Sequence, residues 1–247
     1  MKSLLKLTWV ELKLFLREPV GAFFTLIFPL MVLFIFGTIF GNQPSAYFNG
    51  LGTVDISVPA YTAMIIGTTG LVGLTITVSS YRENGILRRL RTTPIRPLTI
   101  LAAQVIVLFL MTTLGMLLLV IAGKLVYHMR FEGNVLNVVL GFSLSSLSFF
   151  ALGFVLASVL PTARTAQVVG MSLLYPMLFL SGAGYPRELL PDTIIKVSSF
   201  LPLTYVVTLL RGLWVGDTWS QHLTEVLVLT GLLVVGVFVS TRIFRWE

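Results

Sequence analysis

The sequence PVGAFFTLIFPLMVLFIFGTIFGNQPSAYFNGLGTV, from Pro19 to Val54, contains no aspartate, glutamate, lysine or arginine. A membrane-spanning helix needs about 20 mainly apolar residues, because the hydrocarbon core of a bilayer is about 30 Å thick. The stretch is long enough for one such helix and a following loop. Only 11% of the 247 residues are charged, whereas soluble domains have about 25%. The stretch therefore indicates an integral membrane protein.

Five further charge-free runs follow along the chain, and together the six runs predict an all-α integral membrane protein with six transmembrane helices. They leave no room for a second domain, so residues 1–247 are expected to form a single transmembrane domain. The last run is shorter than a usual span, and its helix is therefore expected to begin near His222. The predicted spans cover residues 20–41, 57–81, 98–123, 136–160, 165–185 and 222–241.

Lysine and arginine collect on one side of these six spans. Short cytoplasmic loops are enriched in both residue types. With the N-terminus inside, 12 of the 17 basic residues lie inside, whereas a seventh crossing at Val197 to Leu210 would place Arg242 and Arg245 outside. We therefore expect a multi-pass protein of the cell (plasma or inner) membrane with cytoplasmic N- and C-termini.

Residues 1–18 are too polar to cross the bilayer but suit an interfacial helix. Their basic residues share one helical face, with an apolar row beside it, so the helix can contact membrane lipids through both. Glu11 and Glu18 fit this poorly, and one of them is expected to contact protein. A cleaved signal peptide is the alternative, but the first apolar run is far longer than about 7 to 15 residues. The basic face holds Lys2, Lys6, Lys13 and Arg17, and the apolar row holds Leu5, Trp9, Leu12 and Leu16.

Several functional features are missing from the sequence. Carriers driven by protons or ions usually place ionisable side chains within their spans, but the six charge-free runs contain no acidic, basic or histidine side chain. Glu225, near the start of the last span, is expected at the headgroup level, and His128 and His222, which lie outside the runs, are interpreted as loop residues. No phosphate-binding G-x-x-x-x-G-K-[ST] loop is present, so the chain cannot itself hydrolyse ATP. Nor do we find a constellation typical of catalysis, metal binding or nucleic-acid binding. We expect that any energy source is a separate protein.

The longest polar interruption is the inner loop YRENGILRRLRTTPIRP, from Tyr81 to Pro97, which has five arginines and one acid, Glu83. We expect Glu83 to begin a short helix, because an acid is favoured at the positive end of a helix dipole, and Pro94 to end it. Ile86, Leu87 and Leu90 then form an apolar face flanked by arginines, which suits a protein partner. The alternative is that the arginines only set the topology or contact anionic lipid.

The segment from Leu180 to Trp214 is too apolar for a plain loop, and its glycines and prolines break it too often for a span. Residues 186–214 are therefore expected to form a re-entrant segment of two short helices on the outer side, between spans five and six. It would cap the transport pathway or serve as a plug that anchors the fold. Elsewhere, Gly37 and Gly41 form a small-x-x-x-small pair that predicts close helix packing.

The inner loop from Tyr81 to Pro97 and the outer segment from Leu180 to Trp214 resemble segments of the ABC-2 type permease family of ATP-binding cassette transporters. The inner loop resembles the family's coupling helix, with Ile86 where threonine is frequent, and the outer segment is similar to the signature around its fifth span. The coupling pattern reads Glu83, Gly85, Leu87, Arg88, Arg89, Leu90, Thr93 and Pro94. The outer pattern reads Leu180, Ser181, Gly182, Pro186, Leu201, Pro202, Leu203, Tyr205 and Arg211.

The resemblance implies a homodimer or heterodimer of permease subunits, each docked on a cytoplasmic ATP-binding cassette ATPase subunit. ATP and Mg would bind in that partner, and this chain would bind no cofactor itself. The residues implied for ATPase coupling are Glu83, Gly85, Leu87, Arg88, Arg89 and Arg91. Those implied for the outer gate or re-entrant segment are Gly182, Pro186, Pro202, Tyr205 and Arg211.

The spans offer no fixed counter-charge for a strongly ionic solute, so the expected cargo is a lipophilic or amphiphilic compound, such as a drug or antibiotic, that is moved out of the cell. Export of a lipid-linked polysaccharide by the same architecture is the alternative. From other classes, the chain could be a membrane sensor or structural subunit that transports nothing, or a channel. A channel should show a polar helix face, which the cluster of Ser143, Ser145, Ser146 and Ser148 only suggests.

Overall fold

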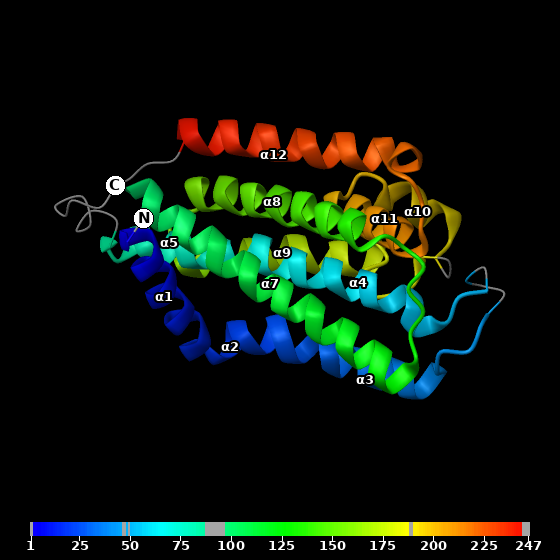
Figure 1. Ribbon diagram of the computed structural model, residues 1–247. Helices are drawn as coiled ribbons and strands as arrows, with labels where there is room; N and C mark the ends of the chain where they lie inside the picture. The colour runs from blue at the N-terminus through cyan, green and yellow to red at the C-terminus, as the bar shows by residue number, and fades with distance from the viewer. Residues whose placement is uncertain (1, 46–47, 49, 87–96, 188–189, 244–247) are drawn as a thin grey trace.

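The computed structural model describes residues 2–45, 48, 50–86, 97–187 and 190–243, and all the regular structure in these residues is helical. The long helices lie side by side along one axis and form an elongated bundle (Figure 1). Five helical segments of the described chain are long and apolar enough to cross a membrane. The predicted all-α membrane fold is confirmed. The five segments are Pro19–Phe40, Thr53–Glu83, Thr99–Tyr127, Val135–Val159 and Trp219–Ile243.

The chain begins with α1 (Lys2–Arg17), which meets the bundle at an angle (Figure 1). The break between α1 and the next helix falls at Glu18, whose backbone is extended. A proline disfavours the helical conformation in the residue before it, and Pro19 occupies the first turn of α2 (Pro19–Ala22). The π-helical η1 (Phe23–Ile27) and α3 (Phe28–Phe40) continue α2 along the bundle.

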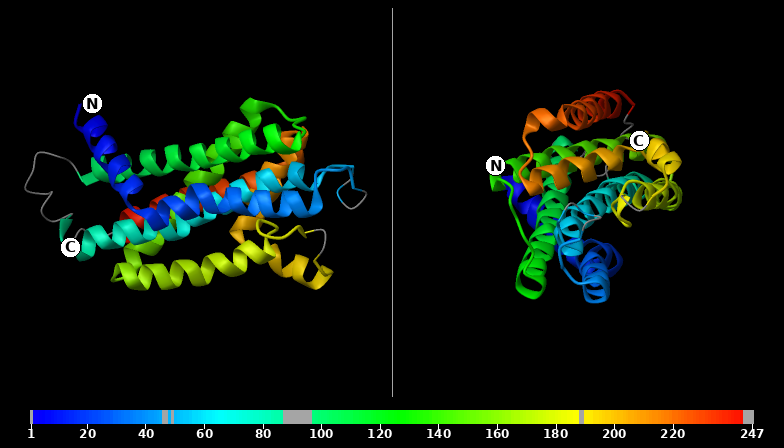
Figure 2. Two further views of the ribbon diagram at one scale, coloured as in Figure 1. Left: turned by 90° about the horizontal axis from the view of Figure 1, so that it is seen from below. Right: turned by 90° about the vertical axis from the view of Figure 1, so that its right-hand side faces the viewer.

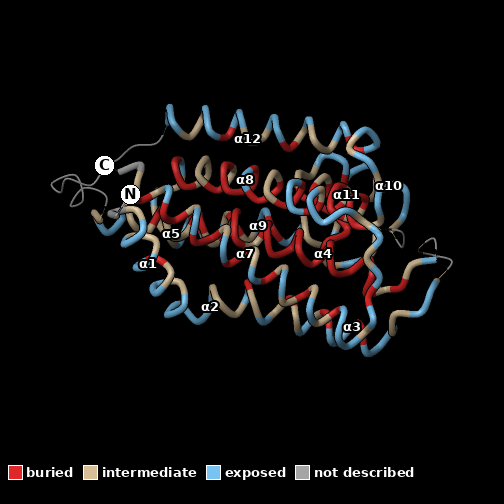
Figure 3. Tube along the Cα trace, viewed as in Figure 1, coloured by how far each residue is buried: buried red, intermediate tan, exposed pale blue. Residues whose placement is uncertain are grey.

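The centre of the bundle is a single helical pass made of α4 (Thr53–Gly67), the π-helical η3 (Thr68–Leu74) and α5 (Thr75–Glu83). Every residue of α4 after Thr53 is buried, and Figure 3 shows this pass as the most buried part of the fold. It packs against helices of all the other passes except the last. A movement of this helix would therefore be felt through most of the bundle.

The remaining passes are α7 (Pro97–Tyr127), α8 (Val135–Val159), α9 (Ala163–Leu180) and α12 (Leu223–Ile243). The last of them, α12, packs mainly on α8 and α11. On α12, large apolar side chains such as Val234, Val235 and Phe238 are exposed, as expected of a helix surface that faces lipid.

Helix α9 is not among the five segments, since its first turns carry polar residues such as Arg164 and Gln167. It nevertheless packs against η3 and α5 and runs along the bundle (Figure 2). The five segments and α9 together correspond in order to the six predicted spans. The start of α1 and the end of α12 lie at the same end of the bundle (Figure 1).

Two short helices, α10 (Asp192–Ser198) and α11 (Pro202–Val215), form the predicted broken segment. They meet at an angle of 101° and lie at the end of the bundle opposite the start of α1 (Figure 1). Pro202 stands in the first turn of α11, where the missing N–H is not needed. The bend between α10 and α11 thus falls where Pro202 starts a new helix.

A close contact between two helices occurs where the sequence did not predict it. A Cβ atom added to Gly153 of α8 would overlap the backbone carbonyl oxygen of Gly70 in η3, so the two backbones touch. The predicted pair behaves differently. Gly37 lies against the ring of Tyr127, with a built Cβ 2.6 Å from Cζ, whereas Gly41 has a φ of +66°, ends α3 and has nothing within 4 Å of a built Cβ. The two glycines therefore do not form one packing surface within the described chain.

Candidate functional site

Polar side chains gather at both ends of the bundle. We call the end at which α5 stops and α9 starts the loop end, and the end that holds α10 and α11 the re-entrant end. The re-entrant end also contains the connections from α3 to α4, from α7 to α8 and from α11 to α12 (Figure 1). Each end joins segments that are far apart in the sequence.

At the loop end, Arg82 and Glu83 attach the end of α5 to the turn between α8 and α9. The Arg82 guanidinium donates through Nη1 to the Ser158 carbonyl oxygen at 3.2 Å and through Nη2 to the Leu160 carbonyl oxygen. Glu83 Oε2 accepts a hydrogen bond from the backbone N of Ala163 at 2.8 Å. The cation thus faces the carbonyl end of one helix and the anion faces the N–H end of the next, which is the favourable sense for both helix dipoles.

The expectation that Glu83 begins a short helix is wrong. Glu83 is the last residue of α5, and the positive helix end that its carboxylate meets belongs to α9. Gly85 then turns the chain with a φ of +65°, a conformation that favours glycine. The other predicted coupling residues, Leu87, Arg88, Arg89 and Arg91, lie outside the described residues, as do Leu90, Thr93 and Pro94.

Helix α1 is also connected to the end of α5. Tyr81 donates a hydrogen bond through its hydroxyl to Glu11 Oε2 at 2.6 Å, and Glu11 is only 8% exposed. Burial raises the pKa of the Glu11 carboxyl, although the hydrogen bond from Tyr81 opposes part of this shift. Of the two acids expected near α1, Glu11 is the one whose side chain hydrogen-bonds to another helix, whereas Glu18 lies at the break after α1. Three consecutive residues at the end of α5, Tyr81 to Glu83, hold α1, α8 and α9.

At the re-entrant end, Asp55 is a buried carboxylate. Its side chain is 2% exposed and accepts hydrogen bonds from Asn42 Nδ2 at 2.9 Å, from Gly52 N at 2.9 Å and from Arg130 N at 2.8 Å. The Asn42 amide in turn accepts from Val54 N. This network ties the connection after α3, the start of α4 and the connection after α7 together. An acid three residues after Gly52, at a helix start, was the available signal.

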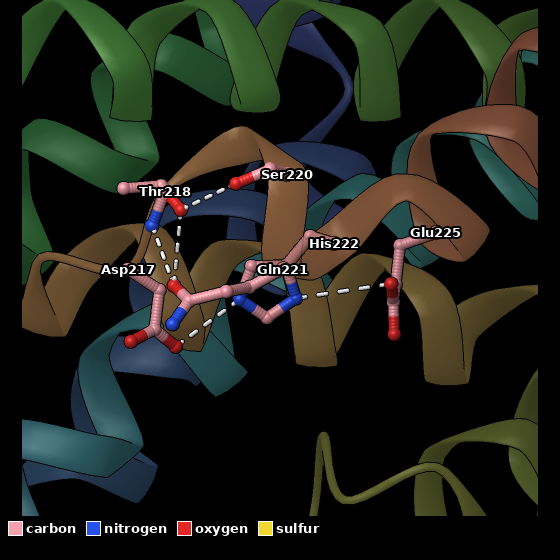
Figure 4. A network of polar contacts seen from close by, with 6 residues as sticks. All are labelled: Asp217, Thr218, Ser220, Gln221, His222 and Glu225. Atoms are coloured by element: carbon pink, nitrogen blue, oxygen red, sulfur yellow. Dashed lines mark hydrogen bonds and ion pairs between the residues drawn. The ribbon is translucent and has the colours of Figure 1, made fainter.

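His222 is the buried centre of a second polar network at this end (Figure 4). Its Nε2 lies 3.1 Å from Asp217 Oδ2, and its Nδ1 lies 3.7 Å from Glu225 Oε2. The ring stands so close to Gly212 that a Cβ on this glycine would overlap it. His222 is therefore not a plain loop residue, as the sequence suggested, but a side chain 8% exposed that joins α11 to α12.

Two cavities lie beside these networks. The larger has a volume of about 300 Å³ and is lined by residues of α4, α11 and the connections from α3 to α4 and from α11 to α12, together with Arg187. The smaller has a volume of about 20 Å³, and Arg211 lines both. Among the described residues, no group of three histidine, cysteine or acidic side chains could hold a metal ion.

The predicted residues of the outer gate separate into two groups. Gly182, Pro186 and Arg211 meet at the smaller cavity. Pro202 and Tyr205 do not line either cavity: Pro202 begins α11, and Tyr205 donates through its hydroxyl to the Ser199 carbonyl oxygen at 2.7 Å. Pro202 and Tyr205 therefore fix the bend between α10 and α11.

Comparison with known proteins places this architecture. The family model described as ABC-2 type transporter matches residues 2–214. Curated relatives include Nodulation protein J of Rhizobium leguminosarum bv. viciae, 31% identical over 42% of this chain and 40% of its own. The inner membrane transport permease YhhJ of Escherichia coli (strain K12) is 26% identical over 74% of this chain and 50% of its own.

A third relative, the probable multidrug ABC transporter permease YbhS of Escherichia coli (strain K12), is 22% identical over 76% of this chain and 49% of its own. The chain thus spans half or less of the length of these three relatives. The family match, in contrast, covers both ends of the bundle and every helix from α1 to α11. This multi-pass membrane protein belongs to the ABC-2 type transporter family.

Proposed function

We propose that this chain is the permease subunit of an ATP-driven exporter that moves a lipophilic or amphiphilic compound out of the cell. The observation that carries the proposal is the junction at the loop end, where Tyr81, Arg82 and Glu83 connect the start of the basic loop to α1, α8 and α9. A partner that moved this loop would move three passes, those of α5, α8 and α9, together with the N-terminal helix α1. Such a junction suits a subunit that receives mechanical work from elsewhere.

The source of that work would be a cytoplasmic ATP-binding cassette ATPase subunit, which would bind ATP and Mg. The sequence of this chain has no phosphate-binding loop of its own. A second permease subunit, identical or different, would complete the complex. The loop end, with the starts of α1 and the basic loop, would then lie in the cytoplasm with both termini, in agreement with the positive-inside rule.

The central pass offers a route from the loop end to the re-entrant end. It runs through 31 residues from Thr53 to Glu83, which corresponds to about 46 Å of helix. One end carries Glu83, and the other carries Asp55 beside the larger cavity. Because a packed helix moves as a unit, a displacement at Glu83 would reach the cavity walls without any further moving part.

The proposed cargo follows from the lack of ionisable side chains in the middle of the spans, since these offer no counter-charge for a strongly ionic solute. The printed name of YbhS, a probable multidrug permease, agrees with a lipophilic cargo for that relative. Export of a lipid-linked polysaccharide is the competing assignment, and a cargo assay separates the two.

The test is a reconstitution. The chain and its candidate ATPase subunit are co-purified and placed in vesicles, and the movement of a fluorescent lipophilic dye and of a lipid-linked oligosaccharide is followed with and without ATP. We expect dye transport that needs both ATP and the ATPase subunit. Vesicles with an ATPase variant that cannot hydrolyse ATP serve as the control. Transport of the oligosaccharide alone would assign a lipid-linked saccharide as the cargo in place of the lipophilic compound. A chain that never associates with an ATPase would overturn the proposal.

A further inference from the structure

We propose that His222, with Asp217 and Glu225, forms a proton-dependent latch on one wall of the larger cavity. With both ring nitrogens protonated, His222 binds the two acids at once, and with one proton fewer it releases Asp217. The latch is distinct from the junction at the loop end and can be measured on the purified chain alone. It rests on the proposed function only for its place in the cell, since the proposed orientation puts this end outside. There, external acidity would keep the latch closed.

The first argument is that two carboxylates face the two nitrogens of one imidazole ring (Figure 4). His222 Nε2 lies 3.1 Å from Asp217 Oδ2, and Nδ1 lies 3.7 Å from Glu225 Oε2. A neutral imidazole has a single N–H, so its other nitrogen would turn a lone pair toward a carboxylate. Only the doubly protonated ring attracts both acids. The second proton lies on the ring, because imidazole is a stronger base than a carboxylate.

The second argument is the way in which the ring is held between two helices. It stands against Gly212 of α11, where a Cβ atom would overlap Nε2, so only glycine leaves room for the ring. The backbone N of Asp217 donates to the Gly212 carbonyl oxygen at 3.0 Å, which keeps Asp217 beside the same residue. Glu225 lies in the first turn of α12, where the positive end of the helix dipole favours its charge. The ring therefore ties the end of α11 to the start of α12.

The exposure of the three side chains decides which contact breaks. The side chains of His222 and Glu225 are 10% and 17% exposed, whereas that of Asp217 is 41% exposed. A buried carboxylate without a donor is costly, but water can hydrate a partly exposed one. A neutral ring therefore keeps its single N–H for Glu225, and Asp217 is released to water. Because Asp217 and His222 both line the larger cavity, the release changes its wall.

Other charged groups of the cavity act on the ring in both directions. Arg187 and Arg211 oppose a positive charge there, whereas Asp55 of α4 favours it. Arg211 and Asp55 already interact with other groups of the protein. Helix α8, on which α12 packs most, carries no ionisable side chain. The arginines therefore do not cancel the attraction of the two acids that face the ring nitrogens.

Histidine is the side chain whose charge ordinarily changes between about pH 5 and pH 8. The sign of the effect follows from the two carboxylates. They bind the protonated ring in the folded protein, so the contribution of the latch to stability is present at the acidic side of this range and is lost as the pH rises. The latch therefore opens toward alkaline pH.

The experiment uses a cysteine as reporter, since the sequence has no cysteine of its own. Val215→Cys places a thiol in the cavity wall, and its rate of labelling by a charged, water-soluble maleimide is measured on the purified chain in neutral detergent. The same reporter in a His222→Gln background is the reference at each pH, so that ionisation of the thiol cancels. We expect the ratio of the two rates to rise about tenfold between about pH 5.5 and pH 8.5, which corresponds to the loss of one charge-assisted contact.

Two controls separate a proton-dependent latch from a merely structural contact. In Glu225→Gln the amide can donate to Nδ1 while the N–H at Nε2 still donates to Asp217. A neutral ring then satisfies both partners, so the ratio should stay low and equal at both pH values. Phe200→Cys, at a position 88% exposed, is the control reporter, and its ratio should not change with pH.

A ratio for Val215→Cys that is constant with pH, or full pH dependence in Glu225→Gln, would overturn the proposal. Protonation of the ring is measured separately by nitrogen NMR of the chain labelled at histidine. His128→Asn leaves His222 as the only histidine, and asparagine tolerates the φ of +49° at position 128.

We expect two protonated ring nitrogens at about pH 5.5 and one at about pH 8.5. A ring with one proton at both pH values would contradict the latch even if a labelling variant misfolds. If the wild type transports no dye in vesicles, the proposed function fails while the labelling and NMR results stand.

Discussion

The carboxylate of Glu83, at the end of α5, accepts a hydrogen bond of 2.8 Å from the backbone N of Ala163, the first residue of α9. The first N–H groups of a helix have no partner within it, so Glu83 satisfies one of them from 80 positions earlier in the chain. The contact joins the start of the basic loop to the beginning of another pass. It is also exposed at the surface of the bundle, where a partner can reach it.

Glu83→Ala should therefore abolish the stimulation of ATP hydrolysis by cargo while leaving membrane insertion intact. The alanine removes both the bond to Ala163 and any charge contact with an ATPase subunit. The measurement is the ATPase rate of the reconstituted complex with and without cargo. Glu83→Gln keeps an acceptor for Ala163 N and loses only the charge, so partial recovery would assign the effect to α9, and no recovery would assign it to the charge.

The control for this pair is Asn84→Ala. Among the described residues, the Asn84 side chain bonds only to Ser80, one turn back at the end of α5, and its removal should not alter coupling. If Glu83→Ala couples as well as wild type does, the role of this residue in energy transfer is disproved.

Asp55→Ala should destabilise the fold strongly, because it leaves the Asn42 amide and two backbone N–H groups without their acceptor. Unpaired buried donors cost about 1–3 kcal/mol each, so we expect a loss of at least about 3 kcal/mol. Thermal loss of the helical circular dichroism signal in detergent measures it. Asp55→Asn retains one carbonyl acceptor and should lose about half as much. Asp192→Ala, an exposed acid of the same end, should unfold as wild type does.

The buried carboxyl of Glu11 predicts a pH dependence. Because burial raises its pKa above the ordinary value in the folded protein, the folded state binds more protons than the unfolded one. The stability that Glu11 contributes is therefore complete below its unfolded pKa, about 4.3, and falls as the pH rises through the raised value.

Glu11→Gln cannot ionise, so it should lose less stability than wild type does between pH 4 and pH 8. Thermal unfolding in detergent at several pH values measures the difference. A constant difference between the two proteins across this range would contradict the shift. Tyr81→Phe removes the hydroxyl that donates to Glu11. Because the ionised carboxylate then loses a hydrogen bond, this variant should lose more stability than wild type does as the pH rises.

The sequence was sufficient for the features that depend on composition along the chain. Charge-free runs marked the long helices, and Pro202 with its neighbours marked the bend between α10 and α11, because both follow from local chemistry. It was insufficient where remote segments meet. The bond from Ala163 to Glu83, the three donors to Asp55 and the ring of His222 against Gly212 all depend on which helix ends become neighbours. Spacing along one segment carries no information about that.

A substitution at Gly153 tests whether the stability of the fold depends on the backbone contact between α8 and the central pass. A Cβ atom there would overlap the carbonyl oxygen of Gly70, which is backbone and cannot rotate away, and Thr75 donates through its hydroxyl to the Gly153 carbonyl oxygen at 3.2 Å across the same seam. Small residues at such seams allow helices in a membrane to approach closely, and packing is the main attraction between them there. Gly153→Ala should push α8 away from η3 and lower the unfolding temperature sharply.

The matched control is Gly231→Ala on α12, where a built Cβ meets nothing within 4 Å. Both changes add one methyl group to a glycine in a helix, and alanine has the higher helix propensity by about 1 kcal/mol, so propensity alone predicts that both variants gain stability. The overlap with Gly70 predicts instead that Gly153→Ala loses stability while Gly231→Ala gains it. Thermal unfolding of the two variants in one detergent decides between these expectations, since equal stabilisation of both would show that the seam between α8 and η3 opens without loss.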